Sequence, residues 1–161
     1  MNKAFLLTGG NLGDRMENLA SARSLLAQNC GNIARVSSIY ETAAWGKKDQ
    51  PGFLNQALEI ETTMDAKQLL RTILKIEKMM GRKRNEKYDP RTIDIDIILF
   101  NEEIFNDPIL KIPHPEMQNR RFVLVPLAEI AAGVKHPVLK KNVNELLQDC
   151  SDELEVKKYH G

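Results

Sequence analysis

Two aspartates interrupt a stretch of sequence that otherwise has the pattern of a β-strand, Ile93 to Leu99. Side chains of a strand alternate between its two faces, so Asp94 and Asp96 should share one face. The aliphatic residues expected on the other face are Ile93, Ile95, Ile97 and Leu99. Two residues of strand rise separate α-carbons by roughly 6–7 Å, so both carboxylates can hold one hard cation or straddle a pair about 4 Å apart. Oxygen ligands without a nearby His or Cys pattern favour Mg²⁺ over zinc, and such a site suits phosphate chemistry.

The ordinary alternative is that Asp94 and Asp96 only face solvent on an exposed sheet. Aspartate is depleted in strands, and a face intended only for water would more readily carry Thr, Lys or Glu. The pair is therefore interpreted as a metal site.

A basic segment, residues 82–91, directly precedes this strand. It holds five basic and two acidic residues, with arginines at Arg82, Arg84 and Arg91. A solvated surface loop is one explanation. Beside a carboxylate-held metal, however, arginines can grip the oxygens of a polyphosphate bidentately.

Two further sites have weaker signals. The glycine-rich turn Gly9–Gly13 lacks the Gly-Lys-Ser/Thr ending of a P-loop and is as consistent with a tight turn as with a ligand contact. His114 lies between two prolines and could donate a hydrogen bond to a phosphate, although a lone loop histidine is more often structural. Arg120 and Arg121, beside Phe122, could likewise be ordinary charged residues of a helix surface.

Composition predicts one globular domain spanning residues 1–161. Hydrophobic residues make up 42% and charged residues 28% of the chain, and the formal net charge is +1. This charge gives no reason to expect a nucleic-acid or membrane partner. No apolar run approaches the roughly 18 residues of a membrane span, so a cytoplasmic protein is expected. Cys30 and Cys150 stand far apart and indicate neither a zinc site nor a disulfide framework.

Hydrophobic periodicity sets the expected order of elements. A buried strand at 4–8 is followed by a helix capped at Asp14, and a second helix begins at Asp65 and ends at Gly81. Strands are expected over Ile33–Thr42 and Leu54–Thr63, joined by a connection long enough to be a binding loop.

This order predicts an α+β fold of the ferredoxin-like, split βαβ type, with both helices on one face of an antiparallel sheet. The other face would stay open, and a C-terminal extension of about 60 residues could build a cleft there. Further helices are expected near 122–132 and 143–147, with a strand near 154–159.

The ordered motifs of the chain resemble the 6-hydroxymethyl-7,8-dihydropterin pyrophosphokinase family of folate biosynthesis. The main motif is the run from Pro90 to Ile98, in which Pro-Arg is followed by Asp-hydrophobic-Asp. The other matching segments are Gly9 with Asn11 and Leu12, Val36–Thr42, Gln50–Asn55, Ile76–Glu77, Gly81–Arg82, Pro113–His114 and Asn119–Phe122.

The resemblance implies transfer of the β,γ-pyrophosphoryl group of ATP to the pterin's hydroxymethyl oxygen, with release of AMP. By position, Asp94 and Asp96 would bind two Mg²⁺ ions, and Arg82 and Arg91 would be catalytic. ATP contacts are implied at Glu77, Arg84, Ile97, His114 and Arg120. Pterin contacts are implied at Thr42, Ala43, Ala44, Trp45, Phe53, Asn55 and Phe122. The resemblance also leads us to expect a monomer acting on small molecules.

The chain departs from the family pattern at a few positions. Asp89 stands where glycine is usual, Tyr88 where tryptophan is frequent, and Ala43-Ala44 where two prolines are common. Two alternatives stay open: another two-metal nucleotidyl or phosphoryl transferase, which would release pyrophosphate or ADP, and a ferredoxin-like RNA-binding or interaction module. The acidic pair on the predicted open face disfavours the second.

Overall fold

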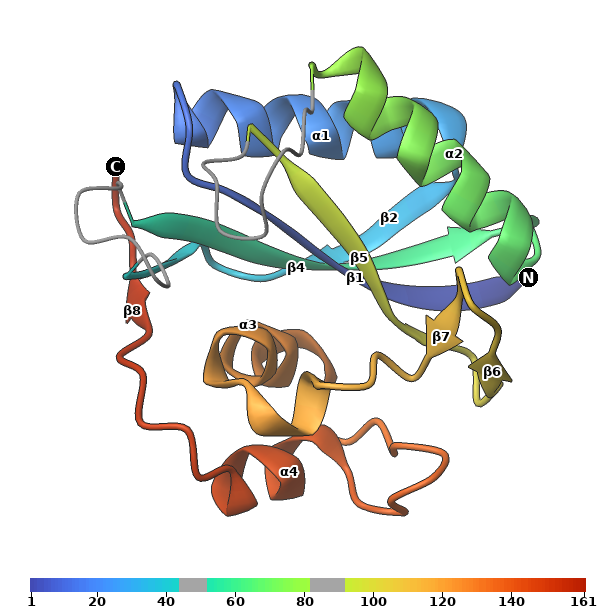
Figure 1. The fold of residues 1–161 in the computed structure, drawn as a ribbon, viewed down its shortest axis with the longest axis vertical. Coiled ribbons are helices and arrows are strands. Elements are labelled where there is room, and N and C mark those ends of the chain that lie inside the picture. Colours follow the sequence, from blue (N-terminus) through green and yellow to red (C-terminus); the bar gives the residue numbers. More distant parts are fainter. Residues whose placement is uncertain (44–51, 82–91) are drawn as a thin grey trace.

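One antiparallel sheet forms the middle layer of the protein (Figure 1). The computed structural model describes residues 1–43, 52–81 and 92–161. The strands are β1 (Asn2–Gly10), β2 (Asn32–Val36), β3 (Tyr40–Thr42), β4 (Phe53–Thr62), β5 (Asp94–Phe100) and β8 (Lys157–Lys158). They lie in the order β5-β1-β4-β3-β8, with β2 also paired to β4, and all of these pairings are antiparallel. The predicted mixed α and β fold around an antiparallel sheet is confirmed.

Two helices, α1 (Arg15–Asn29) and α2 (Ala66–Met79), lie along one face of the sheet (Figure 1). Both begin at the predicted caps: the Asp14 side chain accepts a hydrogen bond from the Glu17 amide, and Asp65 forms a reciprocal capping box with Gln68. Burial of one stripe of each helix against the sheet forms the first hydrophobic core. Its helical members include Leu19, Ala22, Leu26, Leu69, Ile73 and Ile76.

The C-terminal extension adds α3 (Arg121–Ala131) and α4 (Val143–Asp149) on the opposite face (Figure 1). These helices form a second core with sheet residues from β1, β4 and β5. Its sheet members are Phe5, Leu7, Ala57, Ile98 and Leu99, and its helical members include Val123, Leu124, Leu127, Val143 and Leu146. The face that the sequence pattern left open is therefore covered in part by helices.

A β-bulge changes the alternation predicted for β5. Phe5 pairs with Leu99 and the next residue, Leu6, pairs with Ile97, so Ile98 is an extra residue in the ladder. Leu99 consequently packs in the second core, whereas Ile97 packs in the first. The prediction that Leu99 shares a face with Ile97 is wrong, but Asp94 and Asp96 precede the bulge and keep their common face.

The predicted strand from 33 to 42 is divided in two. At Ser37, hydrogen bonds that involve side chains take the place of part of the regular backbone ladder. The Ser37 amide donates to the Ala57 carbonyl at 2.9 Å, and its hydroxyl accepts from the Ala57 amide at 2.9 Å. The Gln56 side chain also donates to the Ser37 carbonyl at 2.9 Å. The chain then continues as β3, which carries Thr42.

The segment between β5 and α3 contains the short pair β6 (Phe105–Asn106) and β7 (Lys111–Ile112), then the 3-10 turn η1 (Met117–Asn119). The predicted strand near 154–159 is shorter than expected, because only Lys157 and Lys158 pair with β3. Among the helices described in the structure, none has the length and apolar character to cross a membrane.

Candidate active site

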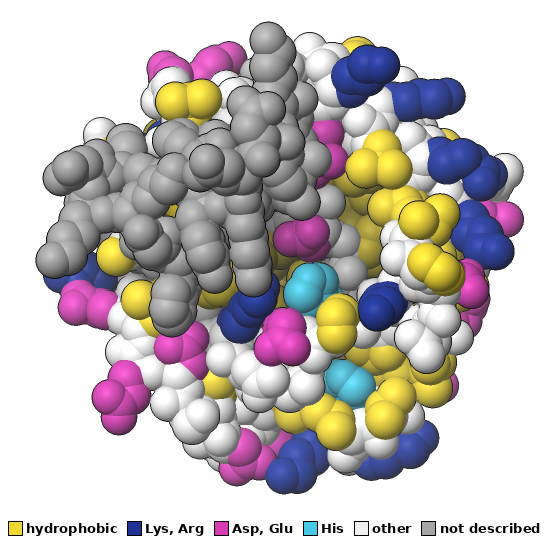
Figure 2. Space-filling model, in the orientation of Figure 1, with side chains coloured by type: hydrophobic (Ala, Val, Ile, Leu, Met, Phe, Trp, Pro, Cys, Tyr) yellow, Lys and Arg dark blue, Asp and Glu magenta, His cyan; other side chains and the backbone are white. Residues whose placement is uncertain are grey.

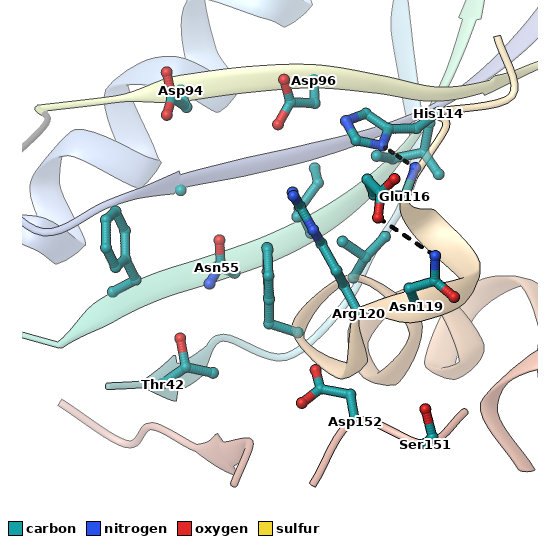
Figure 3. Close-up of a pocket in the computed structure, with 16 residues that line it drawn as sticks. Thr42, Asn55, Asp94, Asp96, His114, Glu116, Asn119, Arg120, Ser151 and Asp152 are labelled. Carbon is teal, nitrogen blue, oxygen red and sulfur yellow. Dashed lines mark hydrogen bonds between the residues drawn. The ribbon is translucent and has the colours of Figure 1, made fainter. Parts of the chain in front are cut away.

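A cavity of about 600 Å³ lies between the second face of the sheet and the start of α3 (Figure 3). Figure 2 shows acidic, basic and histidine side chains gathered near the centre of the same face of the molecule as in Figure 1. The cavity brings together eight of the predicted site residues. These are Thr42, Phe53, Asn55, Asp94, Asp96, His114, Arg120 and Phe122.

Asp94 and Asp96 form one wall, from the first half of β5 (Figure 3). Asp94 is half-buried and Asp96 is exposed. The intervening Ile95 points into the first core, where its backbone N–H donates to Glu77 Oε2 at 2.7 Å. The strand between the two carboxylates is thus held from beneath by α2.

The floor of the cavity is a row of three residues across adjacent strands. Gly9 of β1 pairs with Asn55 of β4 on one side and with Asp94 of β5 on the other. A Cβ atom built on Gly9 would collide with Asn55 Oδ1 and lie 3.1 Å from the Leu54 carbonyl oxygen. Glycine is therefore required here by the close approach of the Asn55 side chain.

Buried polar groups and aromatic rings line the side of the cavity away from the aspartates. Thr42 and Asn55 are each 5% exposed, and the strands that carry them pair so that Thr42 lies opposite Phe53. Phe122 enters the lining from the first turn of α3. Aromatic surface with a few convergent hydrogen-bonding groups is typical of a pocket for a flat, polar ring system.

His114 lies beside Asp96 (Figure 3) and is fixed by two hydrogen bonds. Its backbone N–H donates to the Ile98 carbonyl at 2.9 Å, and its Nδ1 accepts from the Glu116 backbone N–H at 3.2 Å. Because Nδ1 is an acceptor, the neutral ring carries its proton on Nε2. Burial lowers the pKa of His114 and Arg120 lowers it further, against the opposing effects of Asp96 and Glu116. The neutral Nε2–H tautomer is a hydrogen-bond donor at the cavity.

Arg120 extends from the start of α3 toward the wall that carries Asp96 and His114 (Figure 3). Its Cζ lies 5.8 Å from the centroid of the Phe122 ring, a distance typical of a cation–π contact. The nearby Asn119 side chain donates to Glu116 Oε1 at 3.3 Å. Arg120 thus supplies a cation opposite two carboxylates, in a cavity wide enough for a ligand between them.

Three predicted contacts lie elsewhere in the described residues. Glu77 and Ile97 are buried on the α1 and α2 side of the sheet, away from the cavity lining. Ala43 lines a neighbouring cavity of about 370 Å³, which Thr42 also borders. The remaining predicted residues lie outside the described ranges; they are Ala44, Trp45, Arg82, Arg84 and Arg91.

The cavity lining also contains residues to which sequence reasoning assigned no role in the site. Glu116 and Asn119 lie in the short stretch between His114 and Arg120, so their position along the chain was an available signal. Ser151 and Asp152 come from the C-terminal tail. No motif or spacing connects Asp152 with the other site residues, and only the tertiary fold brings it there.

The donor set fits a hard divalent cation that is also held by substrate. Within the described ranges, no group of three or more His, Cys, Asp or Glu side chains is arranged to hold a metal ion by itself. Mg²⁺ is commonly bound through one or two carboxylates together with substrate phosphates and water. Asp94 and Asp96, which line the same cavity wall, are the residues that would hold such an ion.

Comparison with known proteins agrees with this geometry. Residues 5–132 match the family model for 7,8-dihydro-6-hydroxymethylpterin-pyrophosphokinase. The chain is 39% identical over 145 residues to the 2-amino-4-hydroxy-6-hydroxymethyldihydropteridine pyrophosphokinase of Aquifex aeolicus, covering 90% of each chain. It is 45% identical over 135 residues to the protein of that name from Bacillus subtilis, covering 83% of this chain and 81% of the relative.

The fold is also similar to a crystal structure of Plasmodium falciparum HPPK-DHPS, with a TM-score of 0.75 and 19% identity. The superposition covers 92% of this chain and 43% of that larger one. The matched region of the family includes the strands and the α3 residues that build the cavity, apart from the C-terminal tail. The chain therefore belongs to the 7,8-dihydro-6-hydroxymethylpterin-pyrophosphokinase family of enzymes.

Proposed function

We propose that this enzyme transfers the β,γ-pyrophosphoryl group of ATP to the hydroxymethyl oxygen of 6-hydroxymethyl-7,8-dihydropterin, releasing AMP, as a step of folate biosynthesis. One observation carries the proposal: two carboxylates, Asp94 and Asp96, face the same cavity as the buried Asn55 amide, which lies in one row across the sheet with Gly9 and Asp94. This row places a cation site next to a pocket for a flat polar ring, in a chain similar to proteins named pyrophosphokinases.

The pterin would occupy the side of the cavity formed by β3, β4 and the start of α3. Asn55 and Thr42 offer hydrogen-bonding groups from a buried position, and Phe53 and Phe122 offer ring surfaces on which a flat heterocycle can stack. The family resemblance extends this pocket to Ala43, Ala44 and Trp45. The pterin's hydroxymethyl group would then point toward the Asp94 and Asp96 wall.

The phosphates of ATP would lie between the aspartates and Arg120. Arg120 supplies a positive charge, and His114 supplies a neutral Nε2–H donor. In the reaction, the hydroxymethyl oxygen attacks the β-phosphorus, and the bond between the β-phosphorus and the oxygen that leaves with AMP breaks. Preorganised donors of this kind stabilise the charge that develops during this step. The resemblance adds Arg82 and Arg91 as catalytic arginines and Arg84, Glu77 and Ile97 as ATP contacts.

Asp94 and Asp96 would hold two Mg²⁺ ions together with the phosphate oxygens. When bound, such ions neutralise phosphate charge and lower the proton affinity of the attacking hydroxyl. The contribution of the protein is to fix both carboxylates on one face of β5, with the Ile95 amide anchored on Glu77.

We further propose that residues 1–161 act as one ferredoxin-like domain and as a cytoplasmic monomer without a nucleic-acid partner. A shared sheet supports the single domain, because both hydrophobic cores pack on its two faces. Helices α3 and α4 cover much of the sheet face that an RNA-binding module of this topology would present. The monomer is proposed from the family resemblance alone.

The test is to separate the nucleotide products after incubating the protein with ATP, Mg²⁺ and 6-hydroxymethyl-7,8-dihydropterin. The proposal predicts AMP that appears only when pterin is present, in equal amount to the pterin diphosphate. Formation of ADP or free pyrophosphate as the product would indicate a different phosphoryl or nucleotidyl transferase. No turnover would contradict the proposed substrate.

A further inference from the structure

Helix α3 begins at the cavity without a side-chain cap of its own. Arg120 occupies its N-cap position and makes no capping hydrogen bond, because a guanidinium has no acceptor atom, and its side chain extends into the cavity. Ser, Thr, Asp and Asn are the residues that normally accept the free N–H groups of a first turn. The first turn of α3 therefore needs an acceptor from another part of the chain.

Asp152, which lies 31 residues after Arg121, supplies that acceptor. Its Oδ2 accepts the Arg121 backbone N–H at 3.0 Å, and its Oδ1 accepts the Leu154 backbone N–H at 3.0 Å. The Arg121 side chain returns a bond to the Leu154 carbonyl at 3.3 Å. Asp152 is half-buried and lines the cavity, so its carboxylate joins the start of α3 to the tail at the cavity edge.

The tail is also fixed at its other end. We call residues 151–159 the C-terminal strap. Lys157 and Lys158 pair with β3, and the Tyr159 amide donates to the Ile39 carbonyl at 2.8 Å. Arg15 lies over the Tyr159 ring, 5.1 Å from its centroid. The strap thus connects the α3 wall of the cavity with β3, the strand that carries Thr42.

We propose that Asp152 is a positioning residue for the pterin site: it fixes the backbone of Arg121, and through it the next residue, Phe122, whose ring lines the pterin side of the cavity. This inference rests on the proposed function. A carboxylate suits the role because it accepts from two N–H groups at once and places negative charge at a helix N-terminus. Asparagine has one acceptor oxygen, so it would turn an NH₂ group toward one of the two donors.

The experiment compares Asp152→Asn with Asp149→Asn in the 161-residue chain. Asp149 is the matched control, because it lies three residues earlier, carries the same charge and forms an ion pair with exposed Lys141. The pterin dissociation constant is measured by fluorescence titration, and kcat and KM by pterin-dependent AMP release. Thermal unfolding of each variant shows that the comparison is made well below its melting temperature.

Asp152→Asn is expected to weaken pterin binding and raise the pterin KM by about tenfold, with kcat at saturation falling less than about threefold. Asp149→Asn should leave these constants within about twofold of the parent protein. A role limited to general stability would lower the melting temperature without this split between KM and kcat. If Asp152→Asn does not fold, Asp152→Ser, which keeps one acceptor oxygen, is measured in its place.

A second variant removes the same hydrogen bond from the donor side. Proline is favoured at the first position of a helix, and Arg120 has the extended backbone, φ −128° and ψ 112°, that a residue before proline adopts. We therefore compare the change that Asp152→Asn causes in the logarithm of the pterin dissociation constant. In an Arg121→Pro background this change should be less than half of the change in the parent protein.

Three results would overturn the inference: pterin binding by Asp152→Asn within twofold of the parent, an equal loss in Asp149→Asn, or an undiminished effect in the Arg121→Pro background. Failure of the parent protein to bind pterin and release AMP would instead contradict the proposed function, and with it the substrate that the positioning serves. The two failures are distinguishable, because only the second affects the unsubstituted enzyme.

Discussion

Glu77 accepts a hydrogen bond from the Ile95 backbone N–H, and this bond anchors the strand at the residue between Asp94 and Asp96. The carboxylate reaches β5 from α2, on the face of the sheet opposite the cavity. A buried acidic side chain is costly unless it is hydrogen-bonded, so its presence in a helix–sheet interface indicates a specific role. Here that role is to support the two aspartates from beneath.

Replacement of Glu77 by alanine should therefore destabilise the protein. The Ile95 N–H would lose its acceptor in a buried position, which costs about 1–3 kcal/mol. Glutamine at position 77 retains an acceptor oxygen and should cost less than half as much. Urea unfolding of both variants checks this expectation, and equal stability of the alanine variant and the parent would contradict it.

Substitution of Gly9 by alanine should displace the Asn55 side chain from the cavity floor. The added methyl group would occupy the space of Asn55 Oδ1. We expect pterin affinity to fall by about tenfold, because one oriented buried hydrogen-bonding group is lost.

Gly133→Ala is the control for Gly9→Ala, since a Cβ atom at Gly133 meets nothing within 4 Å. Fluorescence titration with the pterin should give an unchanged dissociation constant for this control. A normal constant for Gly9→Ala would show that the position of Asn55 is unimportant for binding.

His114 should titrate below its ordinary pKa of 6.5, because burial and Arg120 both disfavour the imidazolium. NMR titration of the imidazole Cε1–H signals, assigned with His114→Asn, measures the midpoint. Glu116→Gln should lower the pKa of His114 further, because Glu116 favours its protonated form. A midpoint at or above 6.5 in the parent would contradict the burial argument.

The same shift has a consequence for stability. Since the folded pKa of His114 is below the unfolded value, the unfolded chain takes up the proton first. The contribution of neutral His114 to the free energy of unfolding is therefore fully present above about pH 6.5. It is lost as the pH falls toward the pKa of His114 in the folded protein. Unfolding curves of the parent and His114→Asn should diverge less at pH 5 than at pH 7.5.

Tyr40 and Glu129 join β3 to α3 away from the cavity. The Tyr40 hydroxyl donates to Glu129 Oε1 at 2.5 Å, and burial together with this carboxylate raises the pKa of Tyr40 to about 12. Tyr40→Phe should cost about 1–2 kcal/mol of stability, because the charged Glu129 carboxylate loses a hydrogen-bond donor. A double-mutant cycle with Glu129→Gln should show coupling between the two residues, and simple additivity would contradict a direct interaction.

Local sequence patterns predicted the elements and the acidic wall of the site because these depend on residues near one another in the chain. Asp94 and Asp96 share a face through strand alternation, and Asp14 and Asp65 cap helices that follow them directly. The same alternation failed at Leu99, because a bulge depends on how β1 pairs with β5 and leaves no local signal.

The parts that could not be predicted depend on contacts between distant segments. Asp152 reaches the cavity only because the tail crosses the start of α3, and its sequence neighbours give no indication of this. The family resemblance predicted that Glu77 contacts ATP. Its actual position depends on how α2 packs against β5. The family motifs identified most of the lining residues, and the fold determines how the lining is supported.

The most direct test of the central claim compares Asp96→Asn with the parent enzyme in the pterin-dependent AMP assay across a Mg²⁺ titration. Asp107→Asn is the matched control, because Asp107 lies between β6 and β7 and pairs with Lys67 outside the cavity. The account predicts Mg²⁺-dependent AMP release by the parent and the control, and a loss of at least about a hundredfold in Asp96→Asn. AMP release by Asp96→Asn at the parent's rate would contradict the assignment of this cavity as the site of pyrophosphoryl transfer.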